Sequence, residues 1–159
     1  MQNITILCVG KLKEKFYLDA VSEYAKRLSA FCTLSIIELP ECKLSQNPSQ
    51  AEINAALARE AEEIRKKIPK GADVCAMCVE GKQRSSEEFA EMIAASAQRS
   101  SRMCFLIGSS FGLDAKLKQE ADERLSMSKM TFPHHLARVM LLEQIYRGFG
   151  ILAGNRYHK

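Results

Sequence analysis

Short apolar runs alternate along this chain with stretches in which apolar residues recur every three or four positions. The runs have the length of buried strands, and turn-forming residues follow most of them. They predict strands at residues 4–9, 34–39, 74–79 and 103–107, with Gly81 ending the third, and a further strand at 124–128. Buried strands that alternate with helices are typical of an α/β fold on a mainly parallel sheet.

The periodic stretches between these runs predict amphipathic helices. The expected helices span residues 17–28, 50–68, 85–97, 114–121 and 133–149. Two of them begin with the pattern of a capping box, Ser49 with Glu52 and Ser85 with Glu88. The polar segment 41–50 is expected to be a loop. A length of 159 residues fits one domain, 1–159, with a core of its own.

Composition narrows the class of protein. A hydrophobic share of 47% with 26% charged residues excludes wholesale disorder. The N-terminus lacks the features of a signal peptide, and no apolar run reaches the roughly 18 residues of a membrane span. We therefore expect a cytoplasmic protein whose six cysteines are reduced.

Ligands of open parallel sheets bind beyond the carboxyl ends of the strands, where three loops are candidates. Loop 10–15 has a single glycine, which excludes a dinucleotide fingerprint or a P-loop, and we interpret it as a turn with solvated lysines. Loop 108–112 combines glycines and serines that allow close backbone approach to a ligand. Segment 126–135 is rich in methionine and hydroxyl groups, as expected of either a pocket or core filler.

Cysteines and histidines give weaker signals. Cys75 and Cys78 lie three apart in a strand, so their sulfurs point to opposite faces and we interpret them as structural. His134 and His135 are adjacent, which prevents them from sharing one helical face, and the first turn of a helix is a poor place for a catalytic cation. No residue pattern indicates a metal site.

The last predicted helix is unusually apolar. Between residues 136 and 152, 11 of 17 positions are apolar or tyrosine, which is more than one stripe facing the sheet. This breadth predicts a second partner, and a further copy of the chain is the partner we expect.

Several segments together carry a family resemblance. They are Ile-Thr-Ile-Leu-Cys-Val-Gly-Lys-Leu-Lys-Glu-Lys at 4–15, Val-Glu-Gly-Lys at 79–82, Leu-Ile-Gly at 106–108, Leu-Ser-Met-Ser-Lys-Met-Thr-Phe-Pro-His at 125–134, Arg-Val-Met-Leu-Leu-Glu-Gln-Ile-Tyr-Arg at 138–147, and the terminal Tyr-His-Lys. In these segments the chain resembles the ribosomal RNA large subunit methyltransferase H family of SPOUT-class methyltransferases.

This resemblance implies a homodimer with a C-terminal trefoil knot that binds S-adenosylmethionine. It also implies methyl transfer, without a metal, to N3 of a pseudouridine in 23S rRNA of the assembled ribosome. The cofactor-binding residues that it implies are Met77, Gly108, Met127, Ser128, Lys129, Met130, Thr131 and Phe132. The chain departs from the usual family pattern at Met77, where leucine is common, and at Ser109, where a second glycine is common.

The acceptor N3–H must lose its proton, so a base or an anion-stabilising donor would help. His158 and Tyr157 are the expected catalytic residues. Four residues are expected to position RNA phosphates, with a solvated or dimer-pairing charge as the alternative for each: Arg138, Arg147, Arg156 and Lys159. The segment 124–159 holds six basic residues and one acid, so its charge of +5 exceeds the +4 of the whole chain.

Two other classes of protein share parts of this pattern. A flavodoxin-like nucleotide-binding or signalling domain has the same alternation of strands and helices, yet the first strand ends at Val9-Gly10 without a carboxylate. A ribosome-binding module without catalysis would share the basic tail, but it has no use for the loops at 108–112 and 127–132. Binding of S-adenosylmethionine separates the three classes.

Overall fold

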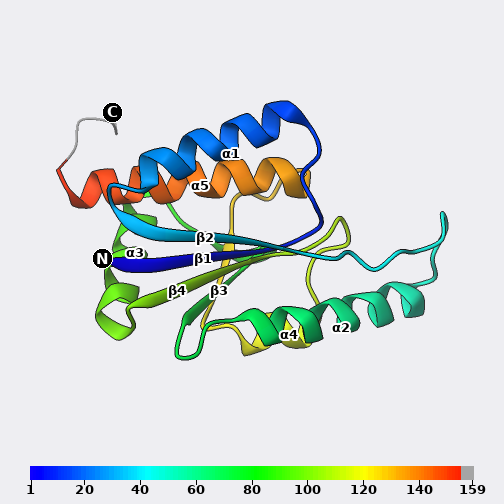
Figure 1. Cartoon of the computed structure of the whole chain (residues 1–159). Helices are drawn as coiled ribbons and strands as arrows, with labels where there is room; N and C mark the ends of the chain where they lie inside the picture. The colour runs from blue at the N-terminus through cyan, green and yellow to red at the C-terminus, as the bar shows by residue number, and fades with distance from the viewer. Residues whose placement is uncertain (155–159) are drawn as a thin grey trace.

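A computed structural model describes residues 1–154, which form a sheet of five parallel strands in the order β2-β1-β4-β3-β5 (Figure 1). The strands are β1 (Gln2–Val9), β2 (Cys32–Leu39), β3 (Asp73–Gln83), β4 (Arg102–Ile107) and β5 (Glu123–Ser126). Because every pair is parallel, a crossover segment returns the chain to the same edge before each new strand. The predicted α/β fold on a parallel sheet is confirmed.

Helices cover both faces of the sheet. They are α1 (Lys15–Leu28), α2 (Gln50–Lys67), α3 (Ser86–Arg99), α4 (Ala115–Glu120) and α5 (His134–Leu152). The helices α1, α3 and α5 lie on one face, and α2 and α4 lie on the other (Figure 1). Both predicted capping boxes are present, at Ser49 and Ser85. Within residues 1–154, no helix is long and apolar enough to cross a membrane.

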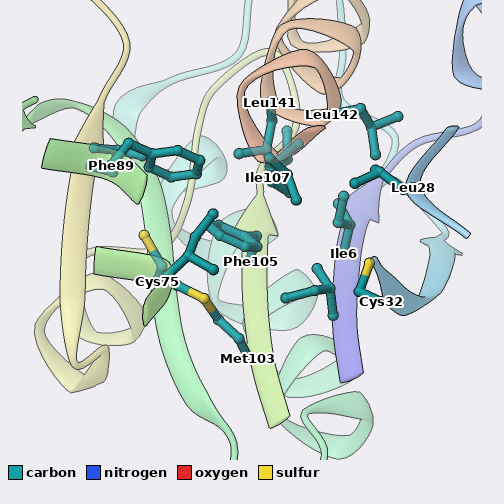
Figure 2. Packing of buried hydrophobic residues seen from close by; sticks show 14 of the residues in the cluster. Ile6, Leu28, Cys32, Cys75, Phe89, Met103, Phe105, Ile107, Leu141 and Leu142 are labelled. Atoms are coloured by element: carbon teal, nitrogen blue, oxygen red, sulfur yellow. The ribbon is translucent and has the colours of Figure 1, made fainter. Parts of the chain in front are cut away.

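The central strand β4 joins the two halves of the core. Met103, Phe105 and Ile107 lie on the face that α5 covers, and Figure 2 shows them in one cluster with Leu141 and Leu142. The intervening residues of β4 face α2 and α4 in the second cluster. This alternation buries both faces of the strand, which is why β4 reads as a continuous apolar run in the sequence.

The apolar breadth of α5 has a cause within the chain. The helix lies between α1 and α3 on the sheet, so three sides of it are covered. The Tyr146 ring lies 6.4 Å from that of Tyr24 on α1, and Phe149 stacks on Phe31 at 5.8 Å. The breadth alone therefore does not require a second copy of the chain, which corrects the argument made from the sequence.

The third strand does not end at Gly81, as the sequence predicted, but continues to Gln83. The register of β3 against β5 shifts between Met77 and Lys82. A Cβ atom at Gly81 would lie 2.7 Å from the carbonyl carbon of Leu125, which is closer than real side chains come. Glycine here permits close approach of two strands rather than ending one of them.

Candidate active site

The carboxyl ends of β3, β4 and β5 surround a cavity of about 310 Å³, here named the methionine cavity. Its lining includes Met77 from β3, residues 107–113 from the end of β4 and the loop after it, and most of the segment 125–132 from the end of β5 onward. Seven of the eight residues that the family motifs single out line it, namely Met77, Gly108, Met127, Ser128, Met130, Thr131 and Phe132. The eighth, Lys129, is exposed and does not line this cavity.

A tight turn after β4 forms one wall of the methionine cavity. A Cβ atom at Gly108 would lie 2.2 Å from the carbonyl oxygen of Gly112, so only glycine fits there. The Gly112 amide donates to the Ser109 carbonyl at 2.8 Å, which closes the turn. Ser109 itself is buried and lines the cavity, so the chain accepts serine at the position where its family commonly has glycine.

The segment after β5 forms the opposite wall through hydrogen bonds of its own. The Ser126 hydroxyl donates to the Ser128 carbonyl at 3.0 Å, and the Met130 amide donates to the Ser128 hydroxyl at 3.0 Å. These bonds bend the chain after Ser126, which is why β5 ends two residues before the predicted boundary. Met130 is 72% exposed where it lines the cavity.

The lining of the methionine cavity contains an ion pair and a neutral thiol. Lys118 donates to Glu80, and this hydrogen bond holds the pKa of that carboxyl below its ordinary value. Burial raises the pKa of the Cys78 thiol, so the group is neutral at neutral pH. Cys75 is fully buried in the core cluster, and burial raises its pKa as well. Cys75 therefore packs in the core, whereas Cys78 is partly exposed and lines the methionine cavity.

A second and larger cavity, here named the histidine cavity, adjoins the first at the same edge of the sheet. Its volume is about 950 Å³, and it lies beyond the ends of β1 and β2. The lining combines residues 10, 11, 13 and 14, residues 38–45, Phe111 and the pair His134–His135. Phe111 and His134 line both cavities, so they form the wall between them.

Sequence reasoning missed the histidine cavity. It interpreted loop 10–15 as a solvated turn and set the two histidines aside. The signal was present, because Gly10-Lys11 and Glu41-Cys42-Lys43 follow the two strands that begin the chain. Parallel strands paired in register bring such loops together at one edge, and Val9 does pair with Leu39.

Arg138 occupies a different position from the one expected of a phosphate-binding residue. Its side chain is 2% exposed and donates to the Glu38 carboxylate at 2.7 Å and to the Gly10 carbonyl at 3.2 Å. We therefore withdraw Arg138 from the set of expected RNA contacts, because it joins α5 to the ends of β1 and β2. Its partners lie more than 90 residues away in the sequence, so spacing could not reveal them.

The other expected RNA contacts divide between two regions. Arg147 lies on α5, where its Nε donates to Glu143 at 2.7 Å and 23% of its side chain is exposed. Arg156 and Lys159 lie outside the described residues, as do the expected catalytic residues Tyr157 and His158. Within residues 1–154, no group of three or more His, Cys, Asp or Glu is placed to hold a metal ion.

Comparison with known proteins identifies the family. A family model described as "Predicted SPOUT methyltransferase" matches residues 2–158. Proteins named "Ribosomal RNA large subunit methyltransferase H" from Bacillus cytotoxicus and Bacillus pumilus are 46% and 45% identical over 158 residues, which is 99% of this chain and 99% of each relative. The Bacillus thuringiensis protein of the same name is 46% identical over the same length.

A solved structure shares the fold. It is titled "The structure of a probable methylase family protein from Haemophilus influenzae Rd KW20", and it superposes with a TM-score of 0.54 at 11% identity. The match covers 99% of this chain and 70% of that one. The full-length matches favour this family over the flavodoxin-like alternative. The chain belongs to the ribosomal RNA large subunit methyltransferase H family of SPOUT methyltransferases.

Proposed function

We propose that this chain is an S-adenosylmethionine-dependent methyltransferase that modifies N3 of a pseudouridine in 23S rRNA of the assembled ribosome. The observation that carries the proposal is the convergence of seven motif residues from three strand ends on one cavity. The names of its full-length relatives support large-subunit ribosomal RNA as the substrate.

The methionine cavity fits the chemistry of this cofactor. Its volume of about 310 Å³ is at the lower end of the range for small-molecule sites. The thioethers of Met77, Met127 and Met130 offer soft, adaptable walls to an aromatic ring or an alkyl chain. Ser128 and Thr131 add hydroxyl groups able to bond a sugar or an amino acid. When bound, the cofactor supplies a methyl group on a sulfonium.

The protein contributes alignment and proton management to such a reaction. In-line displacement requires the acceptor nitrogen to be held against the methyl carbon, so positioning supplies much of the rate. The N3 proton must leave as the new bond forms, and we propose His158 or Tyr157 for this role. Cys78, which lines the cavity, is a protonated thiol at neutral pH because burial raises its pKa, so it does not compete as a nucleophile.

Dimer formation and RNA contact complete the proposal. We propose a homodimer with a C-terminal trefoil knot, in which the exposed side chain of Phe16 on α1 has a partner surface. Phe16 is 66% exposed, so this large ring is available to a partner. We propose Arg147, Arg156 and Lys159 as phosphate contacts, since they belong to the segment that carries the excess positive charge.

Two measurements test the proposal on the full chain. Calorimetry with S-adenosylmethionine should show binding, and labelled methyl should appear on one nucleotide of ribosomes from a strain that lacks the modification. Ribosome binding without detectable cofactor binding would instead favour the non-enzymatic module. Full turnover in a chain that lacks residues 157–159 would eliminate the proposed catalytic role of the tail.

A further inference from the structure

The proposed cofactor leaves the histidine cavity unused, although it is the larger of the two cavities. A methyltransferase needs an acceptor site next to its donor site, because the two reacting atoms must meet within bonding reach. The wall shared by the two cavities consists of Phe111 and His134. The histidine cavity is therefore the neighbouring space from which an acceptor could reach the methionine cavity.

At the floor of the histidine cavity two histidine nitrogens lack a partner among the described residues, and one carboxylate lies near them. A Cβ atom built on Gly10 would lie 3.4 Å from His134 Nε2, 3.8 Å from His135 Nε2 and 3.6 Å from Glu41 Oε2. Both Nε2 atoms are buried and have no hydrogen-bond partner among residues 1–154. Buried polar atoms of this kind cost free energy unless a ligand or water satisfies them.

These floor groups suit a neutral ring that carries both donors and acceptors. Burial is the main cause that lowers the pKa of His134, with His135 and Arg138 adding to the effect and Glu41 and Glu14 opposing it. A neutral imidazole presents one donor and one acceptor nitrogen, and the Glu41 carboxylate adds an acceptor. A nucleobase edge, on which N–H and C=O groups alternate, complements such a set.

The rim of the histidine cavity suits a phosphate backbone. Lys11, Lys13 and Lys43 line it, and all three are exposed. Of the three carboxylates around the cavity within residues 1–154, Glu38 is paired with Arg138, Glu14 lies 3.7 Å from His135 Nδ1, and Glu41 lies near the floor beside the two histidines. Lysine ammonium groups at a rim bind phosphates without reading sequence.

Phe111 adds the remaining element of a nucleotide site. Phe111 is 47% exposed although it lies between two cavities, so its side chain is accessible to a planar group. Aromatic side chains next to basic residues are the usual platform on which proteins stack unpaired bases.

We propose that the histidine cavity receives the acceptor nucleotide of the RNA. Its base lies over the His134–His135 floor and against Phe111, and the flanking phosphates lie against Lys11, Lys13 and Lys43. This inference rests on the proposed function and extends it, because it separates the surface that binds RNA from the cavity that binds the methyl donor. It also adds residues near the N-terminus to an RNA surface otherwise confined to the C-terminal segment.

The rim is tested by a triple variant of the full chain, Lys11→Gln with Lys13→Gln and Lys43→Gln. Its matched control carries Lys66→Gln, Lys67→Gln and Lys116→Gln, which remove the same charge from exposed lysines that line neither cavity. The dissociation constant for ribosomes is measured over roughly 50 to 200 mM salt. The slope of log affinity against log salt should fall by about two to three in the rim variant and stay at the wild-type value in the control.

The floor is tested by His135→Phe, which removes both ring nitrogens with little change of shape. His135 lines only the histidine cavity, so the dissociation constant for S-adenosylmethionine and the thermal midpoint should match the wild type. The KM for ribosomes should rise about tenfold, which corresponds to the loss of one well-placed base contact. His135→Gln, which keeps a polar group near Nε2, should recover part of the loss.

Opposite results overturn the inference. An unchanged salt slope in the rim variant, or an unchanged KM in His135→Phe, would show that RNA does not enter the histidine cavity. A loss of cofactor affinity in either variant would show that the two cavities are not separate sites. If the wild type transfers no methyl, the proposed function fails, and the ribosome-binding measurement still decides whether this rim contacts RNA.

Discussion

Replacing Arg138 with methionine should lower the stability of the protein substantially. The guanidinium donates to Glu38 at 2.7 Å and to the Gly10 carbonyl at 3.2 Å, and it is 2% exposed. Methionine fills most of the same apolar space but donates no hydrogen bond. The variant therefore leaves one carboxylate and one carbonyl without their partner at the carboxyl ends of β1 and β2.

The size of this loss follows from the exposure of the partner. Removing one member of a fully buried ion pair costs about 3–5 kcal/mol. The Glu38 side chain is 36% exposed, so water can partly solvate it after the substitution. We expect Arg138→Met to lower the free energy of unfolding by about 2–3 kcal/mol, the range of one hydrogen bond to a charged group. For a chain of this size that is a fall of about 5–10 °C in the melting temperature.

The pH dependence provides an independent check. Burial acts to raise the pKa of Glu38, but the hydrogen bonds from Arg138 and the Leu12 amide outweigh it, so the net pKa is lowered. A lowered pKa stabilises the folded state above the unfolded value of about 4.3, and this stabilisation disappears as the pH falls through the folded pKa. The difference between wild type and Arg138→Met should therefore be constant near neutral pH and shrink below about pH 4.

Denaturant unfolding at one fixed protein concentration measures this difference, since association would shift apparent stability. The matched control is Lys15→Met, which removes a pair with Asp19 that is exposed on both sides and should cause no measurable change. A stability loss in Arg138→Met below about 1 kcal/mol, accompanied by a raised KM for ribosomes, would refute the structural role. It would restore the phosphate contact expected from the sequence.

Three further predictions concern a helix cap, the cofactor wall and thiol reactivity. Ser49→Ala removes the side-chain cap of α2 and should cost about 1 kcal/mol in urea unfolding, whereas Ser49→Gly should cost only a few tenths. Gly108→Ala places a Cβ within 2.2 Å of the Gly112 carbonyl oxygen, so the turn must shift. Calorimetry should then find the affinity for S-adenosylmethionine reduced at least about tenfold. An unchanged affinity would mean that the turn is not part of the site. Of the six free cysteines only Cys42 and Cys78 are partly exposed, so only these two should react with a thiol reagent in the folded protein, and the raised pKa of Cys78 should make its reaction slow and faster at higher pH. S-adenosylmethionine should protect Cys78, which lines the methionine cavity, and leave Cys42 reactive; equal protection of both would argue against a cofactor site confined to that cavity.

Sequence patterns predicted most of the helices and strands, because the interactions that form these elements involve residues close together in the chain. A capping box needs only residues three apart, and both predicted boxes occur, at Ser49 and Ser85. Amphipathic spacing and buried apolar runs likewise gave the order of helices and strands. The boundary at Gly81 was wrong because a glycine that ends a strand and one that admits a neighbouring strand look the same in sequence.

The sequence predicted one part of the candidate site and missed the other. Motifs of the family pointed to seven residues that the structure brings to one cavity, although they come from three separate parts of the chain. The second cavity went unnoticed, because its floor joins Gly10 and Glu41 to two histidines more than 90 residues further along. Nothing in the spacing of either histidine indicates which strand end it faces.

By itself the sequence determined the alternation of strands and helices, the parallel sheet and the family, since these depend on short-range periodicity and on motifs. Only the tertiary structure decided which individual side chains are buried and which partners they contact. It placed α5 between α1 and α3, which accounts for the apolar surface that had suggested a second copy. It also paired Arg138 with Glu38 across 100 residues. Such contacts depend on how whole elements pack, and a buried charge takes whichever partner that packing brings within hydrogen-bond distance.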